Sequence, residues 1–487
     1  MSSTPPDPAI RANPQAGPAF GADPATEALA ARFPADFAFG AATASYQIEG
    51  AVDQDGRGTS IWDTFSRVPG KVVRGQNGDT AVDHYHRFAE DVQLMANLGL
   101  GAYRFSIAWP RIIPDGDGKV EQRGIAFYRR MLEAVRAAGI APVATLYHWD
   151  LPQALQDRGG WANREIVDVF TRYAQVVHGE LGDLVDTWLT INEPWCAAFL
   201  GYASGVHAPG LTDPRAALRA AHHLLLAHGR AVQAMRGQDA THRYGVVPNL
   251  YGVVTGDSGD PDADHRAAAT VDALQNRLWL DATLLGRYPE EIVALQQRFN
   301  AADAVRPGDM DAIAQPLDLL GVNYYSQHHV RGREPVPVTD PGLAGQEHVE
   351  HLPPPHPRTA MGWSIEPHGL RDLLVRLDRQ WPVPPIMITE NGAAFDDELI
   401  DGAVHDGERQ QYLATHIAAV AEALEAGVDV RGYLAWSLLD NFEWSFGYDK
   451  RFGIVHVDYR TQQRTIKDSG YWYRGLIAAH RRAGAAT

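Results

Sequence analysis

The chain has 487 residues, of which 45% are hydrophobic and 21% are charged. This composition is that of a globular protein with a large core, and it excludes disorder for the bulk of the chain. The formal net charge of −17 opposes binding to polyanions, so neither nucleic acid nor an anionic membrane surface is expected as a partner. No run of about 18 apolar residues appears, so no membrane span is expected either.

The first 30 residues are rich in Ala, Pro and Gly, and they lack the basic start and the apolar stretch of a signal peptide. We expect residues 1–30 to form a disordered arm and residues 31–487 to form a single catalytic domain. Cys196 is the only cysteine, which excludes an intrachain disulfide framework and favours a reducing compartment, the cytoplasm. Cys196 itself is predicted to be a small buried hydrophobic residue. The sequence leaves open whether the chain forms a homo-oligomer.

From residue 37 onward, short apolar runs alternate with segments of helical period, such as 122–138. This alternation is typical of repeated βα units around a parallel sheet. Eight strands are predicted, at 37–45, 102–109, 141–149, 184–192, 243–249, 318–325, 385–391 and 430–438. With a last helix near 470–482, they predict an α/β fold, a closed (β/α)₈ TIM barrel with elaborated loops after the strands. An open doubly wound sheet is disfavoured, because no Gly-rich phosphate turn follows the first strand.

The segment 331–358 contains seven prolines and no periodic pattern. It is predicted to be a long loop after the sixth strand, and loops of this length in compact domains are usually functional or mobile. In a barrel, this loop would lie at the rim of the active-site mouth.

Two glutamates stand where predicted strands end, Glu193 after the fourth strand and Glu390 in the seventh. The carboxyl ends of barrel strands share one face, so these two side chains are expected to converge there. Two facing carboxyl groups, one protonated and one ionised, are what hydrolysis of a glycosidic bond requires. The pair therefore indicates a glycosidase.

Other strand ends carry the side chains that a sugar needs. A pyranose has hydroxyls that bind amides, carboxylates and imidazoles, and an apolar face that packs on indole rings. Such residues are, in chain order, Gln47, Arg104, His148, Trp149, Asn323, Tyr325, Trp436, Glu443 and Trp444.

From about Phe37 to its end, the chain resembles family 1 of the retaining glycoside hydrolases, the β-glucosidase family. Several long motifs in one order carry the resemblance, which makes it specific. They are residues 39–50 (FGAATASYQIEG), 103–106 (YRFS), 146–152 (LYHWDLP), 190–194 (TINEP), 323–325 (NYY), 388–392 (ITENG) and 440–444 (DNFEW).

The resemblance implies that Glu193 is the acid/base and Glu390 the nucleophile, with Arg104 and Tyr325 on either side of the nucleophile. It implies neither cofactor nor metal. The residues implied to bind the non-reducing sugar are Gln47, His148, Trp149, Asn192, Asn323, Trp436, Glu443 and Trp444, and those implied on the aglycone side are Trp195 and Trp363.

The expected activity is that of a retaining β-glucosidase acting by double displacement on β-glucosides and short cello-oligosaccharides. A broad-specificity β-glycosidase, active on galactosides and fucosides, and a 6-phospho-β-glucosidase are the alternatives. The phospho enzymes of the family carry a serine and a lysine where this chain has Glu443 and Trp444, and a carboxylate there would repel a phosphate. Ser364 and His368 depart from the family pattern, which often has glutamates at both positions, so the aglycone preference stays open.

Two other classes compete with this interpretation. A metal-dependent hydrolase is suggested by twenty histidines, but His84 and His86 lie two apart in a helical segment, where they face different directions. The pair His222-His223 is also helical, and neither pair shows the ligand arrangement of a metal site at strand ends. A non-catalytic sugar-binding barrel would be indicated by loss of either glutamate, and both are present.

Overall fold

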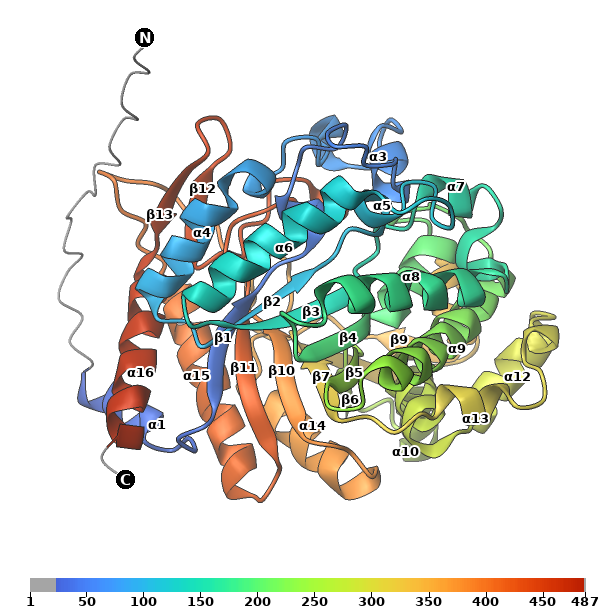
Figure 1. Ribbon diagram of the computed structural model, residues 1–487. Coiled ribbons are helices and arrows are strands. Elements are labelled where there is room, and N and C mark those ends of the chain that lie inside the picture. Colours follow the sequence, from blue (N-terminus) through green and yellow to red (C-terminus); the bar gives the residue numbers. More distant parts are fainter. Residues whose placement is uncertain (1–22, 486–487) are drawn as a thin grey trace, which may run out of the picture.

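A computed structural model describes residues 23–485, and eight parallel strands in it close into a barrel with the ring order β1-β11-β10-β7-β5-β4-β3-β2 (Figure 1). The barrel strands are β1 (Ala38–Ala42), β2 (Ala102–Ser106), β3 (Ala141–Tyr147), β4 (Thr187–Asn192), β5 (Arg243–Val247), β7 (Leu319–Asn323), β10 (Ile386–Asn391) and β11 (Val430–Trp436). Every one lies inside a predicted strand, so the predicted (β/α)₈ barrel is confirmed. Most of the predicted strands are longer than the observed ones. Their last residues belong instead to the segments that follow the carboxyl ends of the strands.

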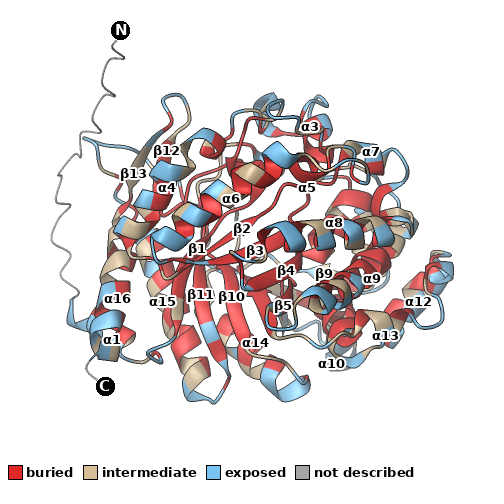
Figure 2. Cartoon of the chain, in the orientation of Figure 1, coloured by how far each residue is buried: buried red, intermediate tan, exposed pale blue. Residues whose placement is uncertain are grey.

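Helices surround the barrel and bury the sides that face it (Figure 2). The helix α6 illustrates the cause, because its apolar residues recur on one face and are buried there, among them Ile125, Met131 and Leu132. The longer helices are α4 (His84–Leu98), α6 (Gln122–Ala137), α8 (Ile166–Leu181), α9 (Pro214–Gln238), α10 (Pro261–Asp272), α12 (Glu290–Arg298), α14 (Pro367–Gln380), α15 (Gly407–Glu425) and α16 (Asp468–Ala485). Shorter ones are α1 (Pro24–Ala30), α2 (Ser45–Ile48), α3 (Ile61–Ser66), α5 (Trp109–Ile112), α7 (Gln153–Gln156), α11 (Leu278–Leu280) and α13 (Asp309–Ile313). No helix within residues 23–485 is long and apolar enough to cross a bilayer.

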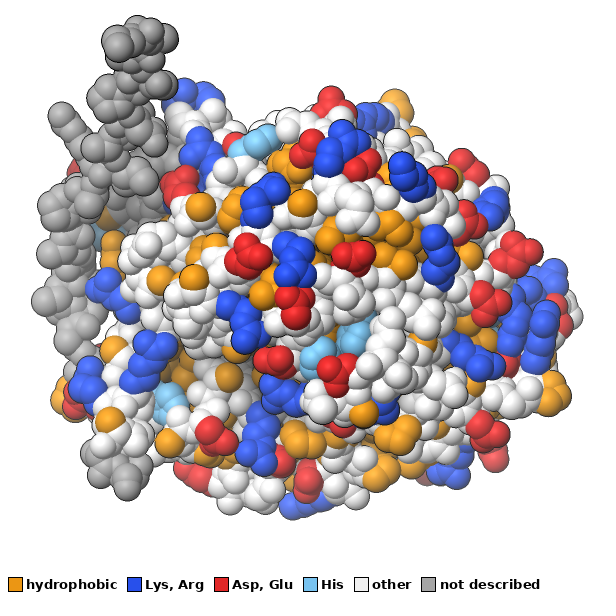
Figure 3. Space-filling model, viewed as in Figure 1, with side chains coloured by type: hydrophobic (Ala, Val, Ile, Leu, Met, Phe, Trp, Pro, Cys, Tyr) orange, Lys and Arg blue, Asp and Glu red, His pale blue; other side chains and the backbone are white. Residues whose placement is uncertain are grey.

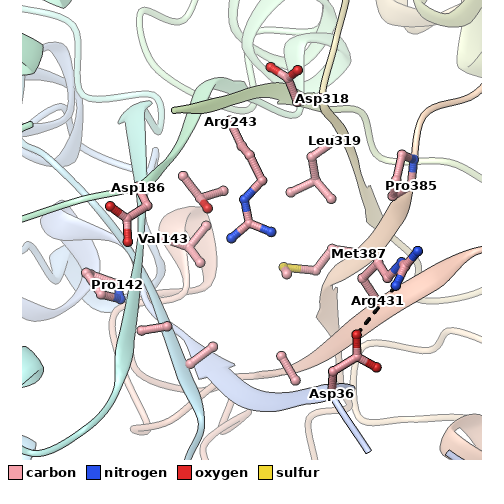
Figure 4. A pocket seen from close by; sticks show the side chains of 14 residues that line it. Asp36, Pro142, Val143, Asp186, Arg243, Asp318, Leu319, Pro385, Met387 and Arg431 are labelled. Atoms are coloured by element: carbon pink, nitrogen blue, oxygen red, sulfur yellow. Dashed lines mark ion pairs between the residues drawn. The ribbon is translucent and has the colours of Figure 1, made fainter. Parts of the chain in front are cut away.

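The amino ends of the strands surround a cavity of about 380 Å³ (Figure 4). Its floor is apolar, with Val143, Leu319 and Met387, and charged side chains stand at its rim. Asp36 and Arg431 form an ion pair there, at 3.5 Å. On the face of the molecule shown in Figure 3, charges of both signs are interspersed. The polar strand-end residues of the sequence analysis lie at the other end of the barrel.

The proline-rich segment 331–358 is more ordered than predicted. The strands β8 (Gln327–Gly332) and β9 (Val349–His351) pair antiparallel, and β8 also pairs in parallel with β6 (Gly252–Thr255). The backbone hydrogen bonds of this small sheet supply the order that the sequence pattern does not reveal. A second unpredicted element is the hairpin of β12 (Val455–Asp458) and β13 (Gln463–Ile466), which follows the last barrel strand.

The predicted N-terminal arm, residues 1–30, lies mostly outside the described residues. Its last part forms α1, which begins at a Pro at N1 and is capped by the Asp23 side chain. The helix packs beside α16, where the Trp472 indole donates to the hydroxyl of Thr26 at 3.1 Å. The capping signal explains why this stretch is helical although its composition suggests disorder.

Candidate active site

A cavity of about 240 Å³ opens at the carboxyl ends of the barrel strands. Ten of the fourteen predicted site residues line it: His148, Trp149, Glu193, Trp195, Tyr325, Trp363, Glu390, Trp436, Glu443 and Trp444. The other four, Gln47, Arg104, Asn192 and Asn323, lie behind this wall and hydrogen-bond to residues in it. The structure therefore brings all fourteen together.

Irregular backbone aims the two glutamates into the cavity. The ladder between β4 and β5 shifts register between Leu189 and Asn192, and Glu193 follows directly with a left-handed backbone, φ 43°. The ladder between β10 and β7 shifts between Ile388 and Glu390. Bulges and left-handed non-glycine residues are costly and cluster at functional sites, where they re-aim side chains.

Two cavity-lining tryptophans have the same backbone conformation. Trp149 has φ 76° and Trp444 has φ 50°. Their rings lie together, with centroids 4.6 Å apart, and the Trp149 indole donates to the backbone carbonyl of Asn192 at 3.0 Å. This strained backbone places indole rings where the apolar face of a sugar can pack.

The carboxyl group of Glu390 is held from both sides. The Arg104 guanidinium donates to Oε1 at 2.5 Å and the Tyr325 hydroxyl to Oε2 at 2.7 Å. Arg104 also donates to Asn192 Oδ1 at 2.6 Å and to the hydroxyl of Thr145 at 3.1 Å. Both predicted neighbours of the nucleophile thus contact Glu390, and Arg104 is fixed in turn by its other partners.

The carboxyl group of Glu193 has different partners. The Asn323 amide donates to Oε1 at 2.7 Å, and the Cys196 thiol donates to Oε2 at 3.2 Å. The Asn323 amide also donates to Asn192 Oδ1 at 3.1 Å, the same oxygen that accepts from Arg104. The predicted burial of Cys196 is confirmed, but its treatment as an inert hydrophobe misses the hydrogen bond. The spacing of three residues permits this contact, but only the folded turn shows that the two side chains meet.

The two carboxyl groups differ in acidity for a physical reason. Burial and the neighbouring Glu390 raise the pKa of Glu193 to about 8. Burial also raises the pKa of Glu390, but Arg104 and Tyr325 oppose that rise by stabilising the ionised form. When the pair carries one proton, that proton therefore resides on Glu193. A protonated and an ionised carboxyl group then face the same cavity.

Two buried polar atoms in and just behind the inner cavity wall have no protein partner. Asn192 Nδ2 lies 3.1 Å from Nε2 of His148 and donates to it, which leaves the proton of His148 on Nδ1. That Nδ1 and Oε1 of Gln47 are buried without a hydrogen-bond partner. Burial lowers the pKa of His148, so the ring is neutral. One free donor and one free acceptor in a buried cavity are what a ligand with hydroxyl groups would satisfy.

Glu443 completes the inner wall. Its Oε2 accepts from the amide of Gln47 at 3.4 Å, and burial together with Glu390 and Glu193 raises its pKa to about 8. The loop that carries it is anchored by Asp440, which pairs with Lys467 at 2.7 Å and with Arg451 at 2.6 Å. This buried network fixes the loop from which Glu443 reaches the cavity.

The histidines that suggested a metal site have other partners. His84 pairs with Asp91 at 2.8 Å, and His222 pairs with Asp309 at 2.9 Å. Within residues 23–485, no group of three or more His, Cys, Asp or Glu side chains is arranged to hold a metal ion. The site as described therefore consists of carboxyl, amide, imidazole and indole groups.

A closed (β/α)₈ barrel with two unlike carboxyl groups facing each other among indole rings and free polar atoms is the architecture of a glycoside hydrolase. Comparison with known proteins identifies the family. Residues 29–482 match the model of glycosyl hydrolase family 1, and the chain belongs to that family.

Characterised relatives cover nearly the whole chain. The thermostable beta-glucosidase B of Thermobispora bispora is 50% identical over 449 residues, 91% of this chain and 90% of the relative. The bifunctional beta-D-glucosidase/beta-D-fucosidase of Bifidobacterium breve is 48% identical over 461 residues, 92% of this chain and 98% of the relative. Among solved structures, the psychrophilic beta-glucosidase of Micrococcus antarcticus matches with a TM-score of 0.89 and 48% identity, over 93% of this chain and 99% of that one.

Proposed function

We propose that the protein is a retaining β-glucosidase that removes terminal β-glucosyl residues by double displacement. The observation that carries the proposal is the unlike surroundings of two carboxyl groups in one cavity. Glu390 accepts from a guanidinium and a phenol, whereas Glu193 accepts from an amide and a thiol. The first environment favours a carboxylate, and the second tolerates a carboxylic acid.

In the first displacement, the Glu390 carboxylate attacks the anomeric carbon as the bond to the glycosidic oxygen breaks. Glu193 gives its proton to that oxygen, and the aglycone leaves as an alcohol. Once Glu390 is esterified, its charge is gone and the pKa of Glu193 falls. In the second displacement, ionised Glu193 takes a proton from water, which attacks the anomeric carbon and releases Glu390.

Membership of glycosyl hydrolase family 1, a family of retaining enzymes, supports a retaining rather than an inverting pathway. In this site, Glu193 and Glu390 line the same cavity of about 240 Å³, and the charge of Glu390 raises the pKa of Glu193. Retaining enzymes keep their carboxyl groups about 5–5.5 Å apart, whereas inverting enzymes need about 6.5–9.5 Å to admit a water. Direct attack by Glu390 therefore fits this site better than attack by water.

The inner cavity supports an unphosphorylated glucose as the bound sugar. None of the described residues that line it is Lys or Arg, so nothing in the wall would neutralise a phosphate. Gln47 and His148 offer a free acceptor and a free donor to hydroxyl groups, and Glu443 and Trp444 contribute a carboxyl group and an indole ring.

A broader β-glycosidase is the second candidate. The Bifidobacterium breve relative is named as both glucosidase and fucosidase, and related sugars differ only in the orientation or absence of a few hydroxyls. A panel of 4-nitrophenyl β-glycosides would rank glucose, galactose and fucose. We include three further points in this proposal: short cello-oligosaccharides as natural substrates, a part in cellulose degradation, and a cytoplasmic location. The free thiol of Cys196 supports the cytoplasmic location.

Azide rescue tests the two assigned roles. In Glu193→Ala, 2,4-dinitrophenyl β-glucoside should still glycosylate Glu390, because its leaving group needs no proton. Added azide should then give β-glucosyl azide. In Glu390→Ala, azide should attack the opposite face and give the α-azide. Proton NMR distinguishes the two products, and the reverse pattern would exchange the assignments.

A chelator control tests the class of enzyme. Hydrolysis of a chromogenic β-glucoside should be unchanged after treatment with EDTA. Loss of activity with EDTA and its return with a divalent metal would indicate a metal-dependent hydrolase. Binding of glucose without any hydrolysis would indicate a sugar-binding barrel.

A further inference from the structure

The cavity at the amino ends of the barrel strands lies at the opposite end of the barrel from the catalytic carboxyl groups. Its volume of about 380 Å³ falls within the range of small-molecule sites, about 300–1,000 Å³. We propose that this amino-end cavity binds a small monocarboxylate with an apolar tail, such as octanoate. The carboxylate would bind Arg243, and the tail would cover the cavity floor. This binding site goes beyond the glucosidase function and does not depend on it.

Small side chains on two neighbouring strands leave room for the tail. The interior of a (β/α)₈ barrel is usually filled by layers of bulky side chains. At the amino end of this barrel, the inward positions of β1 and β2 carry only Ala38 and Ala102. The floor beside them consists of Val143, Leu319 and Met387, which are buried in one apolar cluster inside the barrel. Because the floor is the end of a packed interior, the cavity is preformed.

Arg243 points into this cavity from the start of β5. Side chains alternate between the two faces of a strand, and Val247 of β5 belongs to the apolar cluster inside the barrel, so Arg243, four residues earlier, also faces inward. Figure 4 shows the Arg243 side chain reaching from its strand into the middle of the cavity. Among the described residues, the guanidinium has neither an ion-pair partner nor a hydrogen-bond partner.

The carboxylates at the rim of the cavity, in contrast, are already paired. Each has an arginine as its partner: Asp36 with Arg431 at 3.5 Å, Asp186 with Arg136 at 3.8 Å, and Asp318 with Arg236 at 2.6 Å. A cationic ligand would have to compete with these arginines. An anionic ligand finds the guanidinium of Arg243 free.

The floor decides what the anion carries. A guanidinium binds a carboxylate through two parallel hydrogen bonds, and it can also bind a phosphate. The hydroxyl groups of a sugar phosphate, however, would lose water against Val143, Leu319 and Met387 without a hydrogen bond to replace it. An alkyl chain on the same side chains gains free energy instead. The combination therefore selects a carboxylate with an apolar tail.

Methionine methyl NMR can distinguish this site from the catalytic cavity. Met387 lines the amino-end cavity, and Met361 lines the catalytic one. In protein labelled with methyl-¹³C methionine, octanoate below its micelle concentration should shift the Met387 signal saturably and leave the Met361 signal unchanged. Met387→Leu and Met361→Leu assign the two signals.

The ligand series tests the tail and the charge separately. From butanoate to octanoate, each added methylene that the floor covers should tighten binding by up to about fourfold. Octylammonium has the same tail and the opposite charge, so it should bind more weakly than octanoate.

The variant Arg243→Gln should raise the dissociation constant of octanoate roughly fivefold. The factor is modest because the guanidinium is exposed, and ion pairs in contact with water contribute less than buried ones. A matched control is Arg287→Gln, which removes another exposed arginine, one that lies outside the cavity. The control should keep the dissociation constant of the parent protein.

Four results would overturn the inference: no saturable shift of Met387, a shift of Met361 alone, equal binding of octanoate and octylammonium, or an unchanged dissociation constant in Arg243→Gln. None of these measurements uses hydrolysis. The proposed glucosidase function is tested separately by azide rescue, so failure of one is distinguishable from failure of the other.

Discussion

The hydrogen bond from Cys196 to Glu193 should set the alkaline limit of activity. Burial and the adjacent Glu193 raise the pKa of the thiol, so it stays protonated and donates to the carboxylate. Replacing Cys196 with Ala removes this donor without removing a charge. The ionised form of Glu193 loses stabilisation, and the pKa of Glu193 rises.

The size of the pKa shift of Glu193 follows from the strength of the thiol as a hydrogen-bond donor. Hydrogen bonds to charged groups contribute about 1.5–3 kcal/mol, and a thiol is a weak donor, so about half of that range applies here. One pKa unit corresponds to about 1.36 kcal/mol. The pKa of Glu193 should therefore rise by roughly 0.5–1 unit in Cys196→Ala. In Cys196→Ser, a stronger hydroxyl donor should move it in the opposite direction.

The assay is the pH dependence of kcat/KM with phenyl β-glucoside, whose leaving group needs a proton. The alkaline limb should shift upward in Cys196→Ala and downward in Cys196→Ser. Because 2,4-dinitrophenyl β-glucoside needs no proton to leave, its first step should not show the shift. Alkaline limbs that coincide in all three proteins, or that move the same way in both variants, would refute a role for the thiol in tuning Glu193.

Three further outcomes are expected. The parent enzyme should lose kcat/KM for phenyl β-glucoside as the pH rises through about 8, the pKa of Glu193; an alkaline limb below pH 6 would contradict this. Glu443→Ser should lower kcat/KM for glucosides at least roughly tenfold, since it leaves buried sugar hydroxyls without their hydrogen-bond partner, a loss of about 1–3 kcal/mol. Because burial raises the pKa of Glu443 to about 8, the folded state loses stability as pH rises from about 4.5 to 8, so Glu443→Gln should raise Tm more at pH 8 than at pH 4.5.

The barrel was predictable because its signals are local. Each barrel strand is a short apolar run buried on both faces, and α6 shows a buried stripe at helical spacing. The small sheet of β6, β8 and β9 was not predicted, because prolines hide the pattern of its loop. Its order comes from pairing between strands that are distant in the sequence, and periodicity in one segment carries no information about that.

The polar part of the site was likewise predictable, and the apolar side chains at the mouth of the cavity, Val206 and Phe446, were not. Sugar-binding groups lie in long motifs at strand ends, so Gln47 and Glu443 could be named from sequence. Val206 and Phe446 are single apolar residues in loops, where nothing local distinguishes a cavity wall from ordinary packing. Cys196 was assigned to packing for the same reason, because a thiol three residues after Glu193 becomes a donor only when the turn and the side-chain direction are known.

Arg104 links the binding of the sugar to the orientation of the nucleophile. It donates to Glu390 and to Asn192, and Asn192 donates to His148, which has a free donor in the cavity. A sugar hydroxyl that accepts from His148 therefore joins a hydrogen-bond network that positions Arg104 against the Glu390 carboxylate. Interactions of this kind favour the transition state when they hold the carboxylate in the orientation from which it attacks the anomeric carbon. Loss of a single sugar hydroxyl should accordingly reduce kcat as well as raise KM.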